Sequence, residues 1–273
     1  MPKTRDEILM ELATLSDLTE MNMLGIQYGF QGMYDQAKII FEYILEHDPQ
    51  NVDVLSNLGM VHGFLGEFRL SIEYYQRTLE LDGHHLPALG NLAIVYAKIG
   101  EFEQSIASWK RYLTLAPEDP EAWCTLGIVY FDQGDLENAF VCSTNALKLD
   151  STLIKAKNTL AGIYTYRGDY DKAIALSEEI LAQAPWDLFV LTNLGVAYQM
   201  KGEIAKAIEY HEKALTLDLT FYVAHTNLGW VYHQEGNLAK AIECYEKALQ
   251  LEPEYADAAE NLRQAKEAMK KNQ

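Results

Sequence analysis

The 273-residue chain contains 40 acidic and 22 basic residues, so its formal net charge at pH 7 is −18. This acidic balance argues against nucleic acid as a partner, because phosphate binding requires a basic surface. No run of 18 apolar residues occurs, which predicts that no segment inserts directly into a membrane.

The first 17 residues are expected to form a separate N-terminal capping helix, 1–17. Thr4 and Glu7 have the spacing of a capping box. Ile8, Leu12 and Leu15 would place one apolar stripe along this helix. The segment lacks the long apolar run of a signal peptide, and it does not fit the pattern that follows.

From Leu18 onward the sequence repeats with a fixed period of 34 residues. Seven glycines mark this period without insertion or deletion, and they are Gly32, Gly66, Gly100, Gly134, Gly168, Gly202 and Gly236. We divide the region into seven rows and number the positions of each row as columns 1 to 34. The rows are 18–51, 52–85, 86–119, 120–153, 154–187, 188–221 and 222–255. A fixed period of this length is typical of a stacked-repeat solenoid.

Each row predicts a pair of helices. In row 2, Leu55, Leu58 and Leu65 recur at helical spacing. The glycine at column 15 should end this first helix, because only glycine adopts the left-handed conformation without penalty. A second amphipathic helix follows, as over 70–81, and four rows have proline at column 32 to stop it. Columns 8 and 20 hold small residues throughout, which predicts a backbone-to-backbone approach of the two helices.

Residues 256–273 are expected to form a C-terminal capping helix. Ala259, Leu262 and Ala265 continue an apolar face there. A solenoid needs terminal caps with polar outer faces, so the two end segments complete the predicted architecture.

The column pattern resembles the tetratricopeptide repeat. Row 4 shows the start of that motif as Trp123, Leu126, Gly127 and Tyr130. Row 7 shows most of the remainder as Gly229, Tyr232, Ala241, Tyr245, Ala248 and Pro253. The resemblance covers residues 18–255. It implies an all-α, right-handed superhelical α-solenoid of tandem helix-turn-helix repeats, with a concave groove lined by each first helix.

No catalytic, cofactor or metal site is recognised in the sequence. Gly25, Gly29 and Gly32 lie on a predicted helix and its cap, so they do not form a phosphate loop after a strand. His225 and His233 lie two helical turns apart, roughly 12 Å along the axis, which is too far to share one metal ion. We therefore expect a protein that is not an enzyme and has no cofactor.

The three cysteines, Cys124, Cys142 and Cys244, show no pairing or metal-ligand spacing. This usage favours a cytoplasmic protein.

The resemblance places columns 2, 5, 6, 9, 12 and 13 on the concave groove. These columns are mostly apolar or aromatic, with asparagine recurring at column 6. Such a surface predicts binding of a protein or peptide ligand. The candidate groove residues are Ile26, Gly29, Phe30, Asn57, Met60, Gly63, Phe64, Asn91, Ile94, Tyr166, Asn193, Asn227 and Trp230.

Rows 1 and 2 share a pattern in which glycine at column 12 precedes phenylalanine at column 13. We expect the two missing side chains to leave a shallow apolar pocket, floored by Ile26 and Met60. An apolar side chain of the partner would insert there, between Phe30 and Phe64. The alternative is that the glycines allow helix curvature or that the N-terminal helix fills the gap.

Two groove chemistries known in similar proteins can be compared with these columns. The carboxylate clamp of chaperone co-factors does not fit, since its five positions from row 3 onward hold Gly90, Ile94, Thr125, Lys155 and Thr159, with a match only at the lysine. The asparagine ladder of protein O-GlcNAc transferases fits better, through the column 6 residues Asn57, Asn91, Asn193 and Asn227. Asparagines in this column could instead form local hydrogen bonds.

Large aromatic residues also gather at the starts of rows 6 and 7. Trp186 and Phe189 lie at one start, and Phe221 and Tyr222 lie at the next. They either pack into the junctions between rows or form a second contact surface, for a partner or for a homo-oligomer.

The sequence as a whole predicts a non-catalytic scaffold that binds a protein segment or extended peptide in its groove. Two alternatives use the same surface. One is an assembly factor or chaperone for a specific multiprotein complex, and the other is a regulatory subunit of an enzyme encoded elsewhere.

Overall fold

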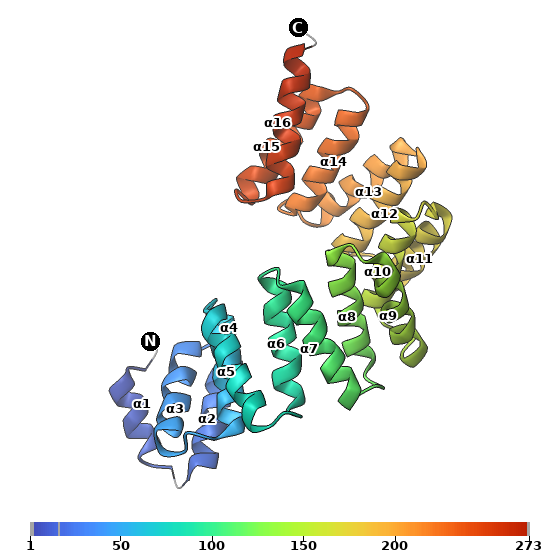
Figure 1. Cartoon of the computed structure of the whole chain (residues 1–273). Helices are drawn as coiled ribbons and strands as arrows, with labels where there is room; N and C mark the ends of the chain where they lie inside the picture. Colours follow the sequence, from blue (N-terminus) through green and yellow to red (C-terminus); the bar gives the residue numbers. More distant parts are fainter. Residues whose placement is uncertain (1–2, 16, 272–273) are drawn as a thin grey trace. The chain divides into compact units, whose positions relative to one another are not determined.

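The computed structural model describes residues 3–15 and 17–271, and these residues form helices joined by short turns (Figure 1). The first helices of the rows are α2 (Leu18–Phe30), α4 (Val52–Phe64), α6 (Leu86–Lys98), α8 (Pro120–Gln133), α10 (Ile154–Tyr166), α12 (Leu188–Lys201) and α14 (Tyr222–Gln234). The second helices are α3 (Tyr34–His47), α5 (Phe68–Leu81), α7 (Phe102–Leu115), α9 (Leu136–Leu149), α11 (Tyr170–Gln183), α13 (Ile204–Leu217) and α15 (Leu238–Leu251). The flanking helices are α1 (Arg5–Leu12) and α16 (Ala256–Lys271). The predicted all-α class is confirmed, while residues 1–2, 16 and 272–273 of the predicted caps lie outside the described residues.

The chain folds as two compact units, with the boundary between Gly134 and Asp135, inside row 4. Unit 1 contains α1 to α8, and unit 2 contains α9 to α16. Within unit 1 the first helices contact one another in order, α2 with α4 and α4 with α6, and each second helix packs on the next first helix. Unit 2 repeats this arrangement through α10, α12, α14 and α16. None of the described helices is both long enough and apolar enough to cross a lipid bilayer.

The column 15 glycines end the first helices as predicted. All seven adopt a left-handed backbone, with φ between +73° at Gly32 and +88° at Gly202. A side chain at such a φ would clash with the following carbonyl oxygen, at a cost of about 1–2 kcal/mol. This turn therefore explains why glycine recurs at an invariant spacing.

The small residue at column 8 makes room for a side chain of the second helix. A Cβ added at Gly59 would lie 2.7 Å from the Tyr75 ring, and one added at Gly25 would lie 2.5 Å from the Phe41 ring. The predicted backbone-to-backbone contact is thus wrong in its detail, because a column 24 side chain occupies the space. The hairpin is nevertheless close-packed, since the Ser71 hydroxyl donates to the Gly59 carbonyl at 2.6 Å.

In other rows the column 24 ring is absent or is turned away from column 8. In row 5, column 8 is Ala161 and column 24 is the small Ser177. In row 3, column 8 is also alanine, and the Trp109 ring instead lies 3.5 Å from the Cβ position of Gly90. In row 4, column 8 is Gly127 and column 24 is Ser143, so small residues occupy both positions. The rows therefore fill this part of the hairpin in different ways.

The N-terminal helix α1 packs on α3. Thr4 and Glu7 form the predicted capping box, and Ile8 and Leu12 are fully buried. The Tyr28 hydroxyl donates to the Glu11 carboxylate at 3.0 Å. Helix α1 therefore caps the core without covering Phe30, which stays 90% exposed.

The C-terminal helix α16 occupies an eighth first-helix position. It begins 34 residues after α14, and it contacts both α14 and α15. Asn261 and Leu262 fall at columns 6 and 7, and Ala265 is fully buried. Column 8 is here the exposed Arg263, because no second helix follows within the described residues to require a small side chain.

Replacing Gly59 by alanine should destabilise the protein, because the new methyl group meets the Tyr75 ring. Overpacking costs about 1–3 kcal/mol, which outweighs the gain of about 1 kcal/mol in helix propensity. Gly29→Ala is the matched control, since a Cβ there meets no described atom within 4 Å. Urea denaturation should show opposite shifts for the two variants, and equal shifts would contradict the steric explanation.

Burial should make the stability of row 6 sensitive to acid through His211. This side chain fills column 24 against Gly195, neither ring nitrogen has a hydrogen-bond partner among the described residues, and burial lowers its pKa to about 4. The unfolded chain binds the proton near pH 6.5, so stability is lost as the pH falls below that value, by about 2 kcal/mol at pH 5.

His211→Phe tests this, because Phe41 fills the same column in row 1. The variant should be more stable than wild type in urea denaturation, and its advantage should grow between pH 7 and pH 5. An advantage that does not change with pH would show that His211 titrates normally in the folded protein.

Candidate functional site

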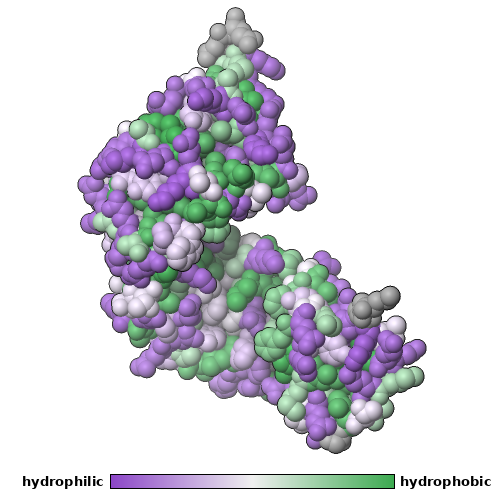
Figure 2. Space-filling view, turned by 180° about the vertical axis from the view of Figure 1, so that it is seen from behind, coloured by the Kyte–Doolittle hydropathy of each residue, from purple (hydrophilic) through white to green (hydrophobic). Residues whose placement is uncertain are grey.

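The candidate site is the exposed surface of the first helices, which we call the first-helix face of each unit. On unit 1 it carries exposed apolar side chains from α2, α4 and α6, namely Met23, Phe30, Phe64 and Ile94. On unit 2 the exposed apolar residues are Tyr166, Phe189 and Met200. Figure 2 shows hydrophobic residues interspersed with hydrophilic ones over the visible surface of both units. Exposed apolar side chains that share one face are typical of an interaction surface.

The two phenylalanines of column 13 differ in how they are held. Phe64 is 62% exposed, and its ring stacks on Tyr34 at the start of α3, with centroids 4.9 Å apart and planes 4° from parallel. Phe30 is 90% exposed, and no stacked ring supports it among the residues that the structure describes. The structure thus offers a fixed aromatic stack on α4 and a solvent-facing ring on α2.

The predicted role of Gly63 as the empty side of a pocket is wrong. A Cβ added there would lie 3.2 Å from the Ser71 hydroxyl and 3.8 Å from a Val95 methyl, so the missing side chain serves packing inside the hairpin. Gly29 differs, because a Cβ there meets no described atom within 4 Å. Ile26 and Met60 are half-buried. Ile26 packs against the core cluster that contains Phe41, and Met60 packs against the cluster that contains Tyr75 and Leu92.

Two of the column 6 asparagines form hydrogen bonds with the preceding first helix. The Asn57 amide donates to Asn22 at 3.1 Å, and the Asn193 amide donates to Asn158 at 2.9 Å. In each case the acceptor lies at column 5 of the preceding first helix. A primary amide has two N–H groups and one carbonyl, so this bond uses only part of its capacity.

Asn91 forms a local hydrogen bond, which is the alternative to a peptide-binding role. Its amide forms a hydrogen bond with the buried Tyr75 hydroxyl, and burial of that hydroxyl raises its pKa. The same residue therefore satisfies a group that would otherwise be buried without a partner.

Another amide pair on unit 2 was not anticipated. The Gln199 amide donates to the Gln234 carbonyl at 2.8 Å, which links α12 to α14. Glutamines at columns 12 and 13 of successive rows are the sequence signal for this pair.

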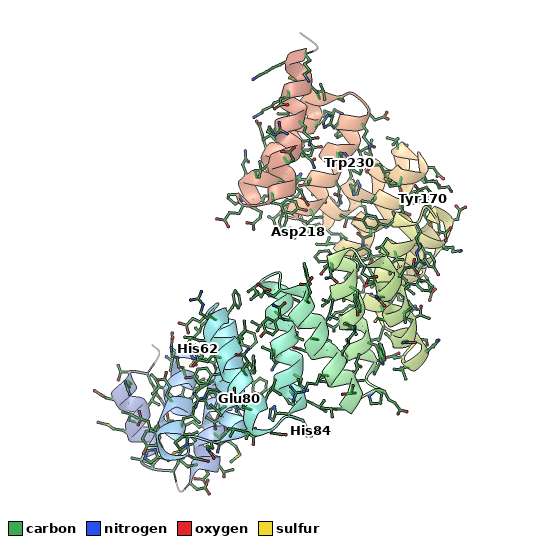
Figure 3. The ribbon with its side chains drawn as sticks, in the orientation of Figure 1. His62, Glu80, His84, Tyr170, Asp218 and Trp230 are labelled. Atoms are coloured by element: carbon green, nitrogen blue, oxygen red, sulfur yellow. The ribbon has the colours of Figure 1, made fainter. Side chains whose placement is uncertain are left out.

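Two of the predicted residues line a hollow on unit 2. Asn227 and Trp230 of α14 meet residues of α16 around a space of about 180 Å³. Figure 3 labels Trp230 on α14. The sequence pattern predicts α16 only as a cap, so it does not indicate that residues of this helix line a hollow.

The aromatic residues at the starts of rows 6 and 7 divide into packed and exposed members. Phe221 is half-buried and contacts Phe189 edge to face at 5.2 Å. Tyr222 meets Tyr255 in the same way at 4.8 Å. Trp186 and Phe189 remain 67% and 61% exposed. The junction is thus packed, while these two rings still face solvent.

Four family profiles of the tetratricopeptide repeat match the chain, over residues 52–85, 90–134, 120–153, 152–220 and 222–255. The chain belongs to the tetratricopeptide-repeat family. A comparison with curated proteins found no significant match.

Solved structures of tetratricopeptide-repeat proteins share the fold. One from Parabacteroides merdae has a TM-score of 0.81 at 20% identity, covering 91% of this chain and 98% of that one. The Cut9–Hcn1 hetero-tetramer of the APC/C has a TM-score of 0.71 at 19% identity, over 96% of this chain and 51% of that one. YrrB, described as having an unusual peptide-binding site, has a TM-score of 0.54 at 20% identity, over 67% and 95%. These identities support the fold alone.

We predict that the exposed rings Trp186 and Phe189 form a contact between two copies of the chain. Light scattering should give a mass above the 31.0 kDa monomer that rises with concentration. Trp186→Ala with Phe189→Ala should return the protein to the monomer mass, because aromatic anchors dominate such contacts. Leu149→Ala is the control, since Leu149 is exposed elsewhere on unit 2. Unchanged mass in the double variant would remove this surface from consideration.

Proposed function

We propose that this protein is a non-catalytic scaffold that binds a protein segment or extended peptide on its first-helix faces. The observation that carries the proposal is the exposed aromatic surface at Phe30 and Phe64. Aromatic rings provide most of the binding energy in typical interfaces, while amides can hydrogen-bond a peptide backbone of any sequence. The peptide-binding site named for YrrB supports this use of the fold.

The proposal includes the absence of enzyme activity, because the repeat columns are accounted for by packing and by the face described above. It also includes a cytoplasmic location, which the spacing of the three cysteines suggests. The strong negative charge favours a protein partner over nucleic acid.

Photo-crosslinking tests the location of the partner. A photoreactive phenylalanine analogue at position 30 should capture a protein from extracts of the source organism. The matched position is Leu70, which is exposed on the second helix α5. Capture that is equal at the two positions would contradict the proposal.

Substitutions then test the contribution of the face to affinity. Phe30→Ala should weaken binding of the captured partner roughly 30-fold, which corresponds to about 2 kcal/mol for an aromatic anchor. Its stability should hardly change, because Phe30 is almost fully exposed. Gly29→Leu should also weaken binding, since the added side chain projects into open space beside Phe30. Full affinity in both variants, measured by isothermal titration calorimetry, would move the site elsewhere.

A further inference from the structure

The hollow between α14 and α16 differs in chemistry from the rest of the first-helix faces. It is lined by Asn227 and Trp230 of α14, together with Tyr255, Asp257, Glu260 and Asn261 at the start of α16. The space of about 180 Å³ lies at the junction of two successive first-helix positions. Its wall on α14 is aromatic and neutral, and its wall on α16 is acidic.

The acidic wall arises where the repeat pattern changes. Columns 2 and 5 of α14 are Val223 and Thr226, whereas the same columns of α16 are Asp257 and Glu260. Columns 2 and 5 are groove columns, so both carboxylates lie on the side of α16 that faces the hollow. The pair therefore alters the face itself and not the solvent-exposed outer surface.

The charges beside the hollow leave it negative. Glu260 accepts from Arg263 at 2.6 and 2.9 Å and from Gln264 at 2.7 Å, and these bonds lower its pKa to about 2. Arg263 also donates to Glu267 at 2.5 Å. Arg263 thus offsets the charge of Glu260, while Asp257, which accepts a hydrogen bond from the neutral Tyr255 hydroxyl, keeps a negative charge at the hollow. Lys266, the next cation along α16, pairs with Glu246 of α15 at 2.7 Å.

The aromatic wall complements this charge. A guanidinium group stacks on the face of an indole ring, and Trp is the strongest such partner. The five N–H donors of the planar guanidinium group also match the geometry of a carboxylate, and they can hydrogen-bond to amide oxygens. Asn227 and Asn261, on opposite walls, supply those oxygens.

We propose that this hollow binds an arginine side chain of the partner segment. The guanidinium would lie against Trp230 and donate hydrogen bonds to Asp257 and Glu260. This inference rests on the proposed function and adds a requirement for a basic residue in the ligand. A basic ligand also complements the net charge of −18.

Peptide titration of the full chain tests the proposal. The probes are nine-residue glycine–serine peptides with one central residue, which is arginine, citrulline or lysine. Citrulline keeps the shape of arginine and removes its charge. The readout is the indole N–H resonance of Trp230, assigned by its loss in Trp230→Phe. The arginine peptide should give a saturable shift, with an affinity at least tenfold above that of the citrulline peptide and reduced by added salt.

The lysine peptide separates a fork-shaped site from a site for any cation. It should bind more weakly than the arginine peptide, because an ammonium group lacks the planar donors. Equal affinities for arginine and lysine would overturn the assignment of arginine. Equal affinities for arginine and citrulline would overturn a charged ligand altogether.

Variants of the acidic wall give a second test. Asp257→Asn with Glu260→Gln should lower the affinity for the arginine peptide at least tenfold. Glu246→Gln is the matched control, because it removes an exposed carboxylate that pairs with α16 outside the hollow. If thermal melting shows that the double variant unfolds, Asp257→Asn alone should still give a several-fold loss. Wild-type affinity in the folded variants would overturn the proposal.

The experiments distinguish a failure of the arginine site from a failure of the proposed scaffold function. Crosslinking at position 30 reports on unit 1 and does not involve the hollow. If that crosslink forms and the arginine peptide does not bind, only this inference fails. If the peptide binds and no crosslink depends on position 30, the hollow is a cation site and the scaffold proposal fails.

Discussion

The fold depends on how closely the two helices of each hairpin can approach. Column 8 lacks a large side chain, and a ring or a small residue at column 24 of the second helix fills the space that remains. A helical glycine costs about 1 kcal/mol, while burying a ring such as Phe41 contributes roughly 1.5–3 kcal/mol. The exchange is therefore favourable within one row. Because each repeat contacts only its neighbours, rows with Ala161 and Ser177 can solve the same volume problem differently without disturbing the others.

This packing leaves several apolar side chains of the first-helix faces exposed, and Phe30 is 90% exposed. The apolar side chains that hold a hairpin together point between its helices or toward the next row, so Phe30 can remain exposed. The distinction applies even to neighbouring glycines of one column. Gly63 is required because Ser71 and Val95 lie against it, whereas Gly29 lies beside open space. A position such as Gly29 can be substituted without disturbing the packing of the hairpin. Substitutions at such positions can therefore change the affinity for a ligand without changing the stability of the fold.

Charged side chains are also distributed differently between the hairpins and the first-helix faces. Lysines at column 19 of rows 5 to 7 lie over the column 11 tyrosines of the same rows, with Lys206 4.6 Å from the Tyr198 ring centroid. These cations are held near the hairpins and do not extend over the first-helix face. At α16 the face gains Asp257 and Glu260. The result is a surface that is apolar near Phe30 on unit 1 and acidic at the hollow on unit 2.

The sequence by itself determined the rows, the helix starts, the left-handed glycines and the N-terminal capping box, because each depends on residues close together in the chain. The left-handed turn at column 15 depends only on the backbone conformation of the glycine itself. The N-terminal capping box depends only on Thr4 and Glu7. Only the tertiary structure showed that Ser71 and Val95 lie where a side chain at position 63 would stand. It also decided the stack of Phe64 on Tyr34, the amide pair Asn57–Asn22 and the hollow beside Trp230. These features join residues from different helices, and their geometry depends on how each helix is rotated about its axis when it packs. Sequence periodicity identifies which face of a helix is buried, but it does not specify that rotation to within the width of one side chain.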